Sequence, residues 1–315
     1  MPTVEDVARR AVAAVGVDTS YRLVCDWVNE RYHELANRVT QMRHLRRQGQ
    51  VYVPAPITAG LVSPTQGSTV VTGDATAQAA WSNDIRSRHI RISITWYKIV
   101  EYSQSRIILD APYAETTAAN ISYSIVQRFT ALDAQARHFG SFTHPRRRGP
   151  VTLVPYQWLE ETFANRQNAG PSPQWVCEVA PGLNEQGQQV KMVELYPYSS
   201  LPEVYNYLYW VAPPQLEPSD ELPQGIEESV MKDGALIDIM RYEMGKSLRA
   251  GQMEAAAIWR NDYRAQRSVW EDRIRETLRA DRGPDDAMSM AELPDPQGQG
   301  YIPSAHTMVY DNWPR

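Results

Sequence analysis

Residues 88–97 of the chain read RHIRISITWY, and the alternation within this stretch decides the fold class. The residues at every second position from Arg88 to Ile94 would share one face of an extended strand, with Arg91 on the opposite face. A period of two is typical of a half-buried β-strand, whereas a helix repeats every 3.6 residues. The pattern therefore predicts a strand over residues 90–97.

The two-residue period continues on both sides of this stretch, from about Val51 to Leu132. Pro and Gly recur as turn signals, and the runs between them are short and rich in β-branched and aromatic residues. The predicted strands cover Ile57 to Val62, Thr69 to Thr72, Ile90 to Tyr97, Arg106 to Leu109 and Ser122 to Gln127. Short strands at such spacing predict a small antiparallel β-sandwich or barrel.

Residues 1–50, which precede the strands, have helical periodicity instead. Thr3 can cap a helix over residues 4–15, and Gly16 would end it. A second helix is expected over residues 20–45, because apolar side chains recur there at steps of three or four. Its apolar stripe consists of Tyr21, Val24, Val28, Tyr32, Leu35 and Val39.

The chain beyond residue 132 passes from irregular structure to helices. Over residues 133–214 we expect a short helix and three strands, at residues 158–166, 174–179, 190–196 and 204–211. Helical periodicity then covers residues 225–248 and 253–280. The helices at the two ends of the chain are expected to pack together.

These elements predict an α+β fold in four parts. We expect a helical core from residues 1–50 and 133–282, interrupted by an inserted β domain at residues 51–132. Residues 283–315 are rich in Pro and lack helical periodicity, yet they keep apolar side chains that a solvating tail would lack. We therefore predict an extended arm that contacts another protein surface. Its candidate contact residues are Met290, Tyr301, Ile302, Met308, Tyr310 and Trp313.

Composition excludes several classes of protein. The two cysteines, Cys25 and Cys177, allow neither a disulfide framework nor a four-cysteine zinc site, and we expect both in the core. The formal net charge of −5 argues against a nucleic-acid binder that uses its whole surface. The sequence has no signal-peptide pattern and no run of ~18 apolar residues, so we expect no membrane association.

The sequence contains no constellation typical of an enzyme. It has no Gly-rich phosphate loop, no nucleophile elbow and no His-Glu-x-x-His motif. The adjacent pairs Glu160-Glu161 and Glu227-Glu228 would point in different directions on a helix and are expected on solvated faces. His138 and His144 flank a loop without metal-ligand spacing. We therefore predict no catalytic residue, no metal and no cofactor.

Aromatic residues favour a role in assembly. The chain has 17 Tyr and 9 Trp but only 4 Phe, and Tyr and Trp suit interfaces that are partly wet. Trp259, Tyr263 and Trp270 share a stripe on one predicted helix, so they belong either to helix packing within one chain or to a subunit interface. A loop with three arginines, Arg146, Arg147 and Arg148, is expected to be exposed, either solvated or touching DNA phosphates.

Several patches in order along the chain resemble the head-to-tail adaptor (connector) proteins of tailed bacteriophages. Residues 25–38, CDWVNERYHELANR, look like the opening helix of that family. Residues 60–81, GLVSPTQGSTVVTGDATAQAAW, are similar to a hairpin inserted in many of its members. Residues 107–132 resemble their strand, Tyr-containing loop and returning strand. The stretch 193–216, with ELYP and YNYLYWVAPPQL, carries the strongest resemblance, and the helix from Gly225 follows in the expected order.

The resemblance implies a structural subunit of a ring, usually of twelve copies, beneath the portal of a DNA-filled capsid. Such a ring extends the DNA channel without reading its sequence and offers a platform to tail or tail-terminator proteins. The implied partners are other copies of this chain, the portal protein and the tail. The implied location is the neck of the virion, after assembly in the host cytoplasm.

A second hypothesis is that the chain is a different structural component of the virion. The chain would then be a tail hub, a tail-tube terminator or another tail component that carries a glycan-binding β module. In that case Trp81, Trp96 and Tyr97 would line an exposed face of the β domain.

Overall fold

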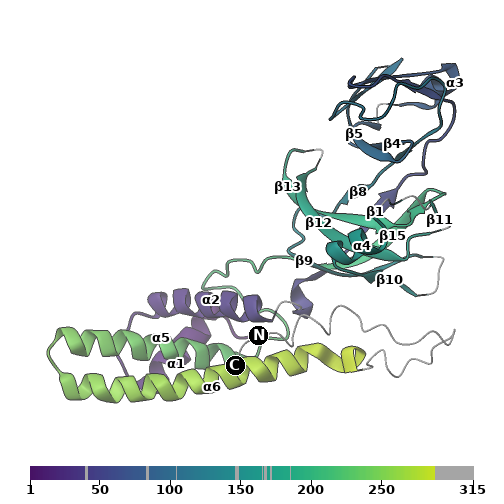
Figure 1. The fold of residues 1–315 in the computed structure, drawn as a ribbon. Coiled ribbons are helices and arrows are strands. Elements are labelled where there is room, and N and C mark those ends of the chain that lie inside the picture. Colours follow the sequence, from purple (N-terminus) through teal and green to yellow (C-terminus); the bar gives the residue numbers. More distant parts are fainter. Residues whose placement is uncertain are drawn as a thin grey trace. The chain divides into compact units, whose positions relative to one another are not determined.

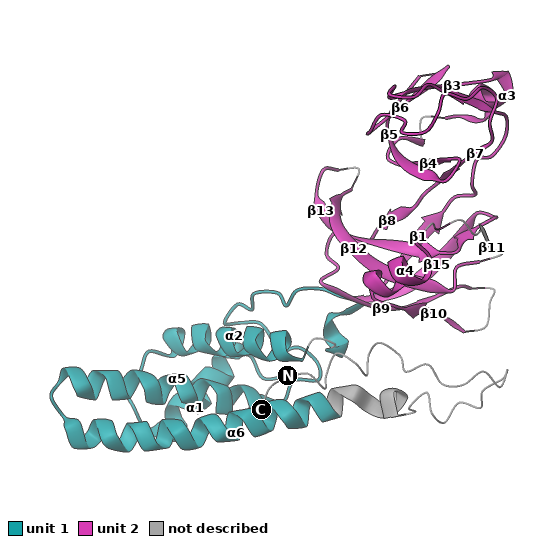
Figure 2. Cartoon of the chain, viewed as in Figure 1, with its two compact units in different colours: residues 1–47, 210–301 teal, residues 48–209, 302–315 magenta. Residues whose placement is uncertain are grey.

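The computed structural model describes residues 1–39, 42–82, 85–103, 105–145, 149–164, 166, 169–170, 172–184 and 186–287. The fold is α+β, and the chain forms two compact units (Figure 1 and Figure 2). Unit 1 contains residues 1–47 and the described residues from 210 onward, and unit 2 contains residues 48–209. The expected border between residues 132 and 133 lies within unit 2.

The first helix, α1 (Val4–Val15), has the expected boundaries. Thr3 forms a capping box with Asp6, in which the hydroxyl of Thr3 accepts from the Asp6 N–H and the Asp6 carboxylate accepts from the Thr3 N–H. The hydrogen bonds to Thr3 lower the pKa of the Asp6 carboxyl. Gly16 ends the helix with φ 69°, a left-handed conformation that glycine adopts without strain.

The second helix, α2 (Tyr21–Arg38), is shorter than expected. The prediction that it continues to Leu45 was wrong, because Arg43–Leu45 forms a 3₁₀ turn (η1) and strand β1 (Arg46–Val53) follows at once. β1 pairs with β15 (Glu203–Trp210), a partner far away in sequence. All members of the expected apolar stripe except Tyr21 are buried.

Two long helices complete unit 1. Helix α5 (Glu228–Arg249) lies against α1, α2 and α6 (Met253–Ala287), as Figure 1 shows for the stacked helices. The expected end of α6 near residue 280 was wrong, since the helix continues to Ala287. The buried faces of α2 and α5 supply more of the apolar core of this unit than those of α1 and α6.

The first part of unit 2 is a six-stranded antiparallel sheet in the order β2-β3-β6-β5-β4-β7. Backbone hydrogen bonds of 2.9 Å between Val62 and Ile121 join its two ends, so the sheet curls upon itself. The helix α3 (Ala75–Ala80) follows β3. The strands are β2 (Val62–Pro64), β3 (Val70–Gly73), β4 (His89–Ile92), β5 (Thr95–Ser103), β6 (Arg106–Leu109) and β7 (Tyr123–Val126).

The stretch that opened the sequence analysis is a tight hairpin and not a single strand. Ser93 has φ 56° and turns the chain between β4 and β5, where Ile92 pairs with Thr95. Ile90 and Ile92 are fully buried, whereas Ile94 is exposed at the turn. The alternation identified the buried face correctly, but it contains no signal for the turn.

The second part of unit 2 is a seven-stranded sheet in the order β1-β15-β9-β10-β12-β13-β8. The expected strands near residues 174, 190 and 204 are present as β12, β13 and β15. The remaining elements are β8 (Phe129–Ala131), β9 (His138–Thr143), β10 (Pro150–Leu153), α4 (Tyr156–Thr162), β11 (Ala169–Gly170), β12 (Trp175–Leu183), β13 (Gln189–Tyr196) and β14 (Tyr198–Ser199). The ends of the expected β insertion, β1 and β8, therefore belong to this sheet.

Candidate interaction surfaces

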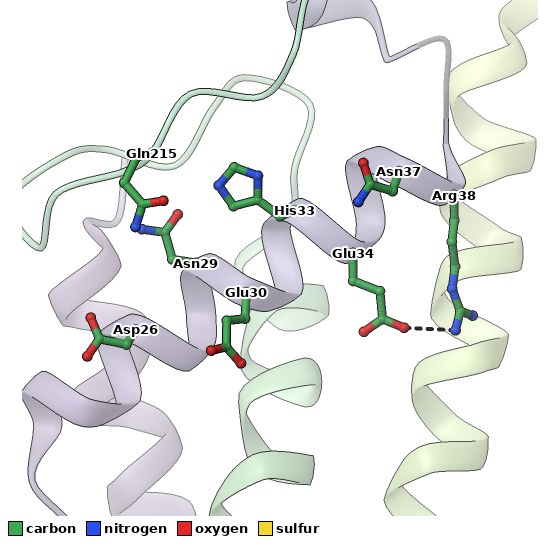
Figure 3. Close-up of a pocket in the computed structure, with 8 residues that line it drawn as sticks. All are labelled: Asp26, Asn29, Glu30, His33, Glu34, Asn37, Arg38 and Gln215. Carbon is green, nitrogen blue, oxygen red and sulfur yellow. Dashed lines mark ion pairs between the residues drawn. The ribbon is translucent and has the colours of Figure 1, made fainter.

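An open groove of about 910 Å³ runs along the solvent side of α2 (Figure 3). It is lined by Asp26, Asn29, Glu30, His33, Glu34, Asn37, Arg38 and Gln215. Asp26 and Glu30 are exposed, and neither forms an ion pair with a residue that the structure describes. The groove is therefore acidic along the turns of α2 that carry Asp26 and Glu30.

Asn29 fixes the loop that borders this groove. Its side-chain amide donates to the carbonyl of Leu216 at 2.7 Å, and its side-chain oxygen accepts from the Leu216 N–H at 3.2 Å. Asn29 thus replaces a backbone partner for a loop that leaves β15, and this contact positions Gln215 at the edge of the groove.

A chain of ion pairs closes the far end of the groove. Arg31 makes two bonds of 2.7 Å to Asp238 of α5 and one of 2.5 Å to Glu34. Burial would lower the pKa of Arg31, but these two carboxylates outweigh that effect and raise it. Arg38 bonds to Glu34 at 2.8 Å and to Glu271 of α6 at 2.7 Å, so α2 is joined to α6 at this point.

Helix α6 carries a second, smaller groove of about 460 Å³ on one flank. Its lining consists of Tyr263, Arg264, Arg267, Ser268, Glu271, Asp272 and Arg275. Arg264 and Arg267 are exposed and make no ion pair within the described ranges, whereas Arg275 bonds to Asp272 at 3.1 Å. Arg260, one turn earlier, is also exposed and unpaired in the same ranges. This flank of α6 is therefore basic.

The three candidate interface residues on α6 have different environments. Trp259 and Tyr263 are half-buried, and Tyr263 lines the basic groove. Trp270 is only 1% exposed, so its assignment to a subunit interface is corrected. Its ring packs against α5 at Gly234, where a Cβ atom would lie 2.9 Å from Cζ3 of Trp270. Trp270 therefore belongs to the packing of unit 1.

The three aromatic residues that would line a glycan-binding face do not form one. Trp81 and Tyr97 are each 4% exposed in the core of the curled sheet. The Trp81 indole donates to the Tyr123 hydroxyl at 2.9 Å, and the Tyr97 hydroxyl accepts from the Ala114 N–H at 3.0 Å. Trp96 is half-buried with its ring 5.5 Å from that of Tyr198. The expectation of an exposed face is therefore wrong.

A different set of aromatic side chains gathers on α4 and β12. The ring of Trp158 lies 6.1 Å from Phe163 and 5.9 Å from Trp175, and Phe163 in turn lies 5.0 Å from Tyr196. Trp158 stays 38% exposed. No periodicity in the sequence joins these residues, because they come from a helix, its end and two strands.

Beside this aromatic set, a buried carboxylate holds two guanidinium groups. Glu194 is fully buried, and its Oε1 accepts from Nε of Arg128 and Nε of Arg166, each at 2.9 Å. Arg166 also bonds at 2.7 Å to Glu160, which is therefore part of an ion-pair network and not of a wholly solvated helix face. Burial, followed by the charge of Glu194, raises the pKa of the neighbouring Tyr198. We interpret this network as structural, since Glu194 joins β13 to α4 and to the start of β8.

The two cysteines are both buried, as expected, at 4% exposure for Cys25 and 0% for Cys177. Burial raises the pKa of the Cys177 thiol to about 12, which disfavours the reactive thiolate. No cluster of three or more His, Cys, Asp or Glu in the described parts of the chain could hold a metal ion. In those parts, no helix is long and apolar enough to cross a bilayer.

Two sets of candidate residues lie outside the described residues. They are the arginine loop of Arg146, Arg147 and Arg148, and the arm residues Met290, Tyr301, Ile302, Met308, Tyr310 and Trp313. Both sets remain predictions.

Comparison with known proteins assigns no family to the chain. No protein-family model matches it, and no curated protein matches its sequence.

The acidic and basic helix flanks were not identified from the sequence. Asp26, Glu30 and Glu34 recur every four residues, and Arg260, Arg264 and Arg267 recur at steps of four and three. These steps place each set on one side of a helix. The spacing was therefore a usable signal, whereas the burial of Trp270 and the pairing of Glu194 depend on contacts between distant parts of the chain.

Proposed function

We propose that this chain is a structural head-to-tail adaptor subunit of a tailed bacteriophage. In this proposal, copies of the chain form a ring beneath the portal, usually of twelve subunits, which extends the DNA channel and provides the docking platform for tail proteins. The protein works in the neck of the virion and breaks no covalent bond. The helical core with its inserted β domain supplies the body of each subunit.

One observation carries the proposal. The helices of unit 1 come from both ends of the chain, and unit 2 is inserted between α2 and α5. The sequence patches that resemble the adaptor family follow the same order, from α2 through the β hairpins to β15 and α5. A resemblance spread over both units and kept in order supports one shared architecture rather than one shared hairpin.

The surfaces of unit 1 support an assembly role. A ring repeats one heterologous contact, so each subunit needs two different faces that fit each other. Unit 1 offers an acidic groove on α2 and a basic flank on α6. The alternative of a glycan-binding tail component depended on the exposure of Trp81 and Tyr97, and their burial removes that support.

Cryo-imaging of mature particles of the phage that encodes this chain tests the proposal. We expect copies that encircle the channel at the neck, in contact with the portal above and the tail below. Particles in which this chain is absent from the neck would contradict the proposal. Mass measurement of the purified chain, alone and with portal protein, would show whether the ring forms before docking.

A truncated chain tests the arm. A chain that ends at Ala287 keeps α6 and lacks residues 288–315, and with them all six candidate contact residues. We expect it to show the circular dichroism spectrum and melting temperature of the full chain but to fail to join portal-containing heads. If the truncated chain still completes infectious particles, the arm has no role in docking.

A further inference from the structure

Helix α6 packs along α5 and leaves one flank with unpaired positive charge. The buried positions Ala256, Trp270 and Ile274 face the bundle. On the basic flank, Arg260, Arg264 and Arg267 form what we call the arginine row. None of the three makes an ion pair with a residue in the described part of the chain.

Helix α2 carries a matching row of carboxylates. Asp26, Glu30 and Glu34 line the groove, and Figure 3 shows the three side chains on the same side of the helix. We call them the acidic row. At a rise of about 1.5 Å per residue, neighbouring carboxylates lie about 6 Å apart along the axis, and the arginines lie about 6 and about 4.5 Å apart. The two rows therefore have opposite charges and similar spacing.

Within one copy, the two rows do not neutralise each other. No ion pair among the described residues joins a member of one row to a member of the other, and α2 meets α6 instead through Arg38 and Glu271. Glu34 is held by Arg31 and Arg38 of its own copy, whereas Asp26, Glu30 and the arginine row make no ion pair among the described residues. Charges of opposite sign on two helix flanks fit a second copy of the same chain, in which each row finds its complement.

We propose that the arginine row on α6 of one copy docks onto the acidic row on α2 of a second copy. This inference rests on the proposed function, because it names the contact through which the copies associate. Tyr263, half-buried at the edge of the basic groove, adds apolar area to the contact. Exposed ion pairs are screened by salt, so the association must weaken as ionic strength rises.

Charge reversal tests the contact with the full chain. One variant carries Asp26→Lys with Glu30→Lys, and the other carries Arg264→Glu with Arg267→Glu; all four side chains are exposed, so the folded unit is expected to keep its melting temperature. In sedimentation velocity at about 50 mM salt, we expect the unaltered chain to associate and each variant alone to stay monomeric. An equimolar mixture of the two variants should associate again, since the unaltered arginine row of the first variant meets the unaltered acidic row of the second, and the two reversed rows also complement each other.

A matched control reverses a charge outside both rows. Asp262→Lys lies on another flank of α6, is exposed, and should leave association unchanged. A mixture that stays monomeric, or variants that associate as well as the unaltered chain, would overturn the proposed contact.

Cysteine cross-linking detects the contact even when it is weak. One chain carries Glu30→Cys and a second chain carries Arg264→Cys; the native Cys25 and Cys177 are buried and do not compete. Cross-linking of the mixture with a bismaleimide, which spans the distance left when two long side chains are shortened to cysteine, should give a covalent heterodimer, whereas Glu30→Cys mixed with Asp262→Cys should not. Absence of the heterodimer contradicts the contact. Neck rings that survive both charge reversals would refute the contact and leave the adaptor function standing.

Discussion

Gly234 of α5 and Trp270 of α6 lie so close together that residue 234 has no space for a side chain. A Cβ atom at residue 234 would be 2.9 Å from Cζ3 of the indole and 3.1 Å from Cγ of Arg31. This close approach lets α6 pack along α5 with the ring of Trp270, which is 1% exposed, between them. The position of α6, and with it the proposed arginine row, depends on this glycine.

Replacing Gly234 by Ala should therefore destabilise unit 1, although alanine is the better helix former. Overpacking costs about 1–3 kcal/mol, and the gain in helix propensity offsets about 1 kcal/mol of it. Gly245, also in α5, has open space around its Cβ position and serves as the control. Urea unfolding should show a lower free energy of unfolding for Gly234→Ala and a higher one for Gly245→Ala. Equal effects of the two substitutions would contradict the packing argument.

Asn29 should matter for stability, whereas its neighbour in the groove should not. Asn29→Ala removes both hydrogen bonds to Leu216 and leaves the buried backbone groups of that residue without these partners, at a cost of about 1–3 kcal/mol. Asn37→Ala changes an exposed residue of the same groove and should stay within about 0.5 kcal/mol. Chemical unfolding of both variants measures the difference, and similar losses would show that the loop is held by other contacts.

Glu194 should be the most sensitive carboxylate of unit 2. Glu194→Gln keeps the size of the side chain but removes the charge that faces Arg128 and Arg166, and breaking a buried ion pair in this way costs about 3–5 kcal/mol. Glu178→Gln removes the exposed partner of Lys191 and should cost less than about 1 kcal/mol. Thermal unfolding compares the two; a small shift for Glu194→Gln would show that Glu160 compensates for the lost charge.

His89 should make unit 2 less stable in acid. Burial, and then the positive charges of Arg128 and Lys98, lower its pKa from 6.5 to about 4. Between these two values the unfolded chain binds a proton that the folded chain rejects, so stability is full above pH 6.5 and falls as the pH drops towards 4. This pKa shift corresponds to a decrease of about 2–3 kcal/mol in the free energy of unfolding between pH 7 and pH 4.5.

The variant His89→Phe keeps a ring against Phe129 and removes the titrating nitrogens. Urea unfolding at pH 7 and at pH 4.5 should show a smaller acid-induced loss in this variant than in the unaltered chain. The other titrating groups are common to both proteins, so they cancel in the comparison. An identical loss in both proteins would show that His89 is not the source of the acid sensitivity.

Local signals in the sequence predicted both ends of α1. Thr3 and Gly16 mark the two ends of α1, and both could be recognised because capping depends on only a few neighbouring residues. The end of α2 could not be found in this way, since it is decided by the pairing of β1 with β15, which lies more than a hundred residues further along the chain. The turn at Ser93 was missed because a residue with positive φ is recognised in a sequence when it is a glycine, and here it is a serine.

The candidate surfaces were predictable only in part. Tyr263 borders a groove as a surface residue should, but Trp270 on the same stripe is buried because Gly234 admits its ring. A helical stripe records which residues point the same way, not which neighbour covers them. The rows of charge on α2 and α6 can be recognised from the steps between their residues once the helices are known. The proposed contact between the two rows could not be predicted in this way, because it joins two copies of the chain.

The insertion of unit 2 between α2 and α5 sets an order of events during synthesis. The β strands of unit 2 are contiguous in sequence and can fold as they leave the ribosome, whereas α1 and α2 must wait for α5 and α6. Once β1 pairs with β15, the hydrogen bond between Leu45 and Val211 brings the two halves of the helical bundle together. When unit 2 folds first, it brings together the two ends of the long segment between α2 and α5. The entropic cost of closing this segment is then no longer part of the last step, in which the helices pack.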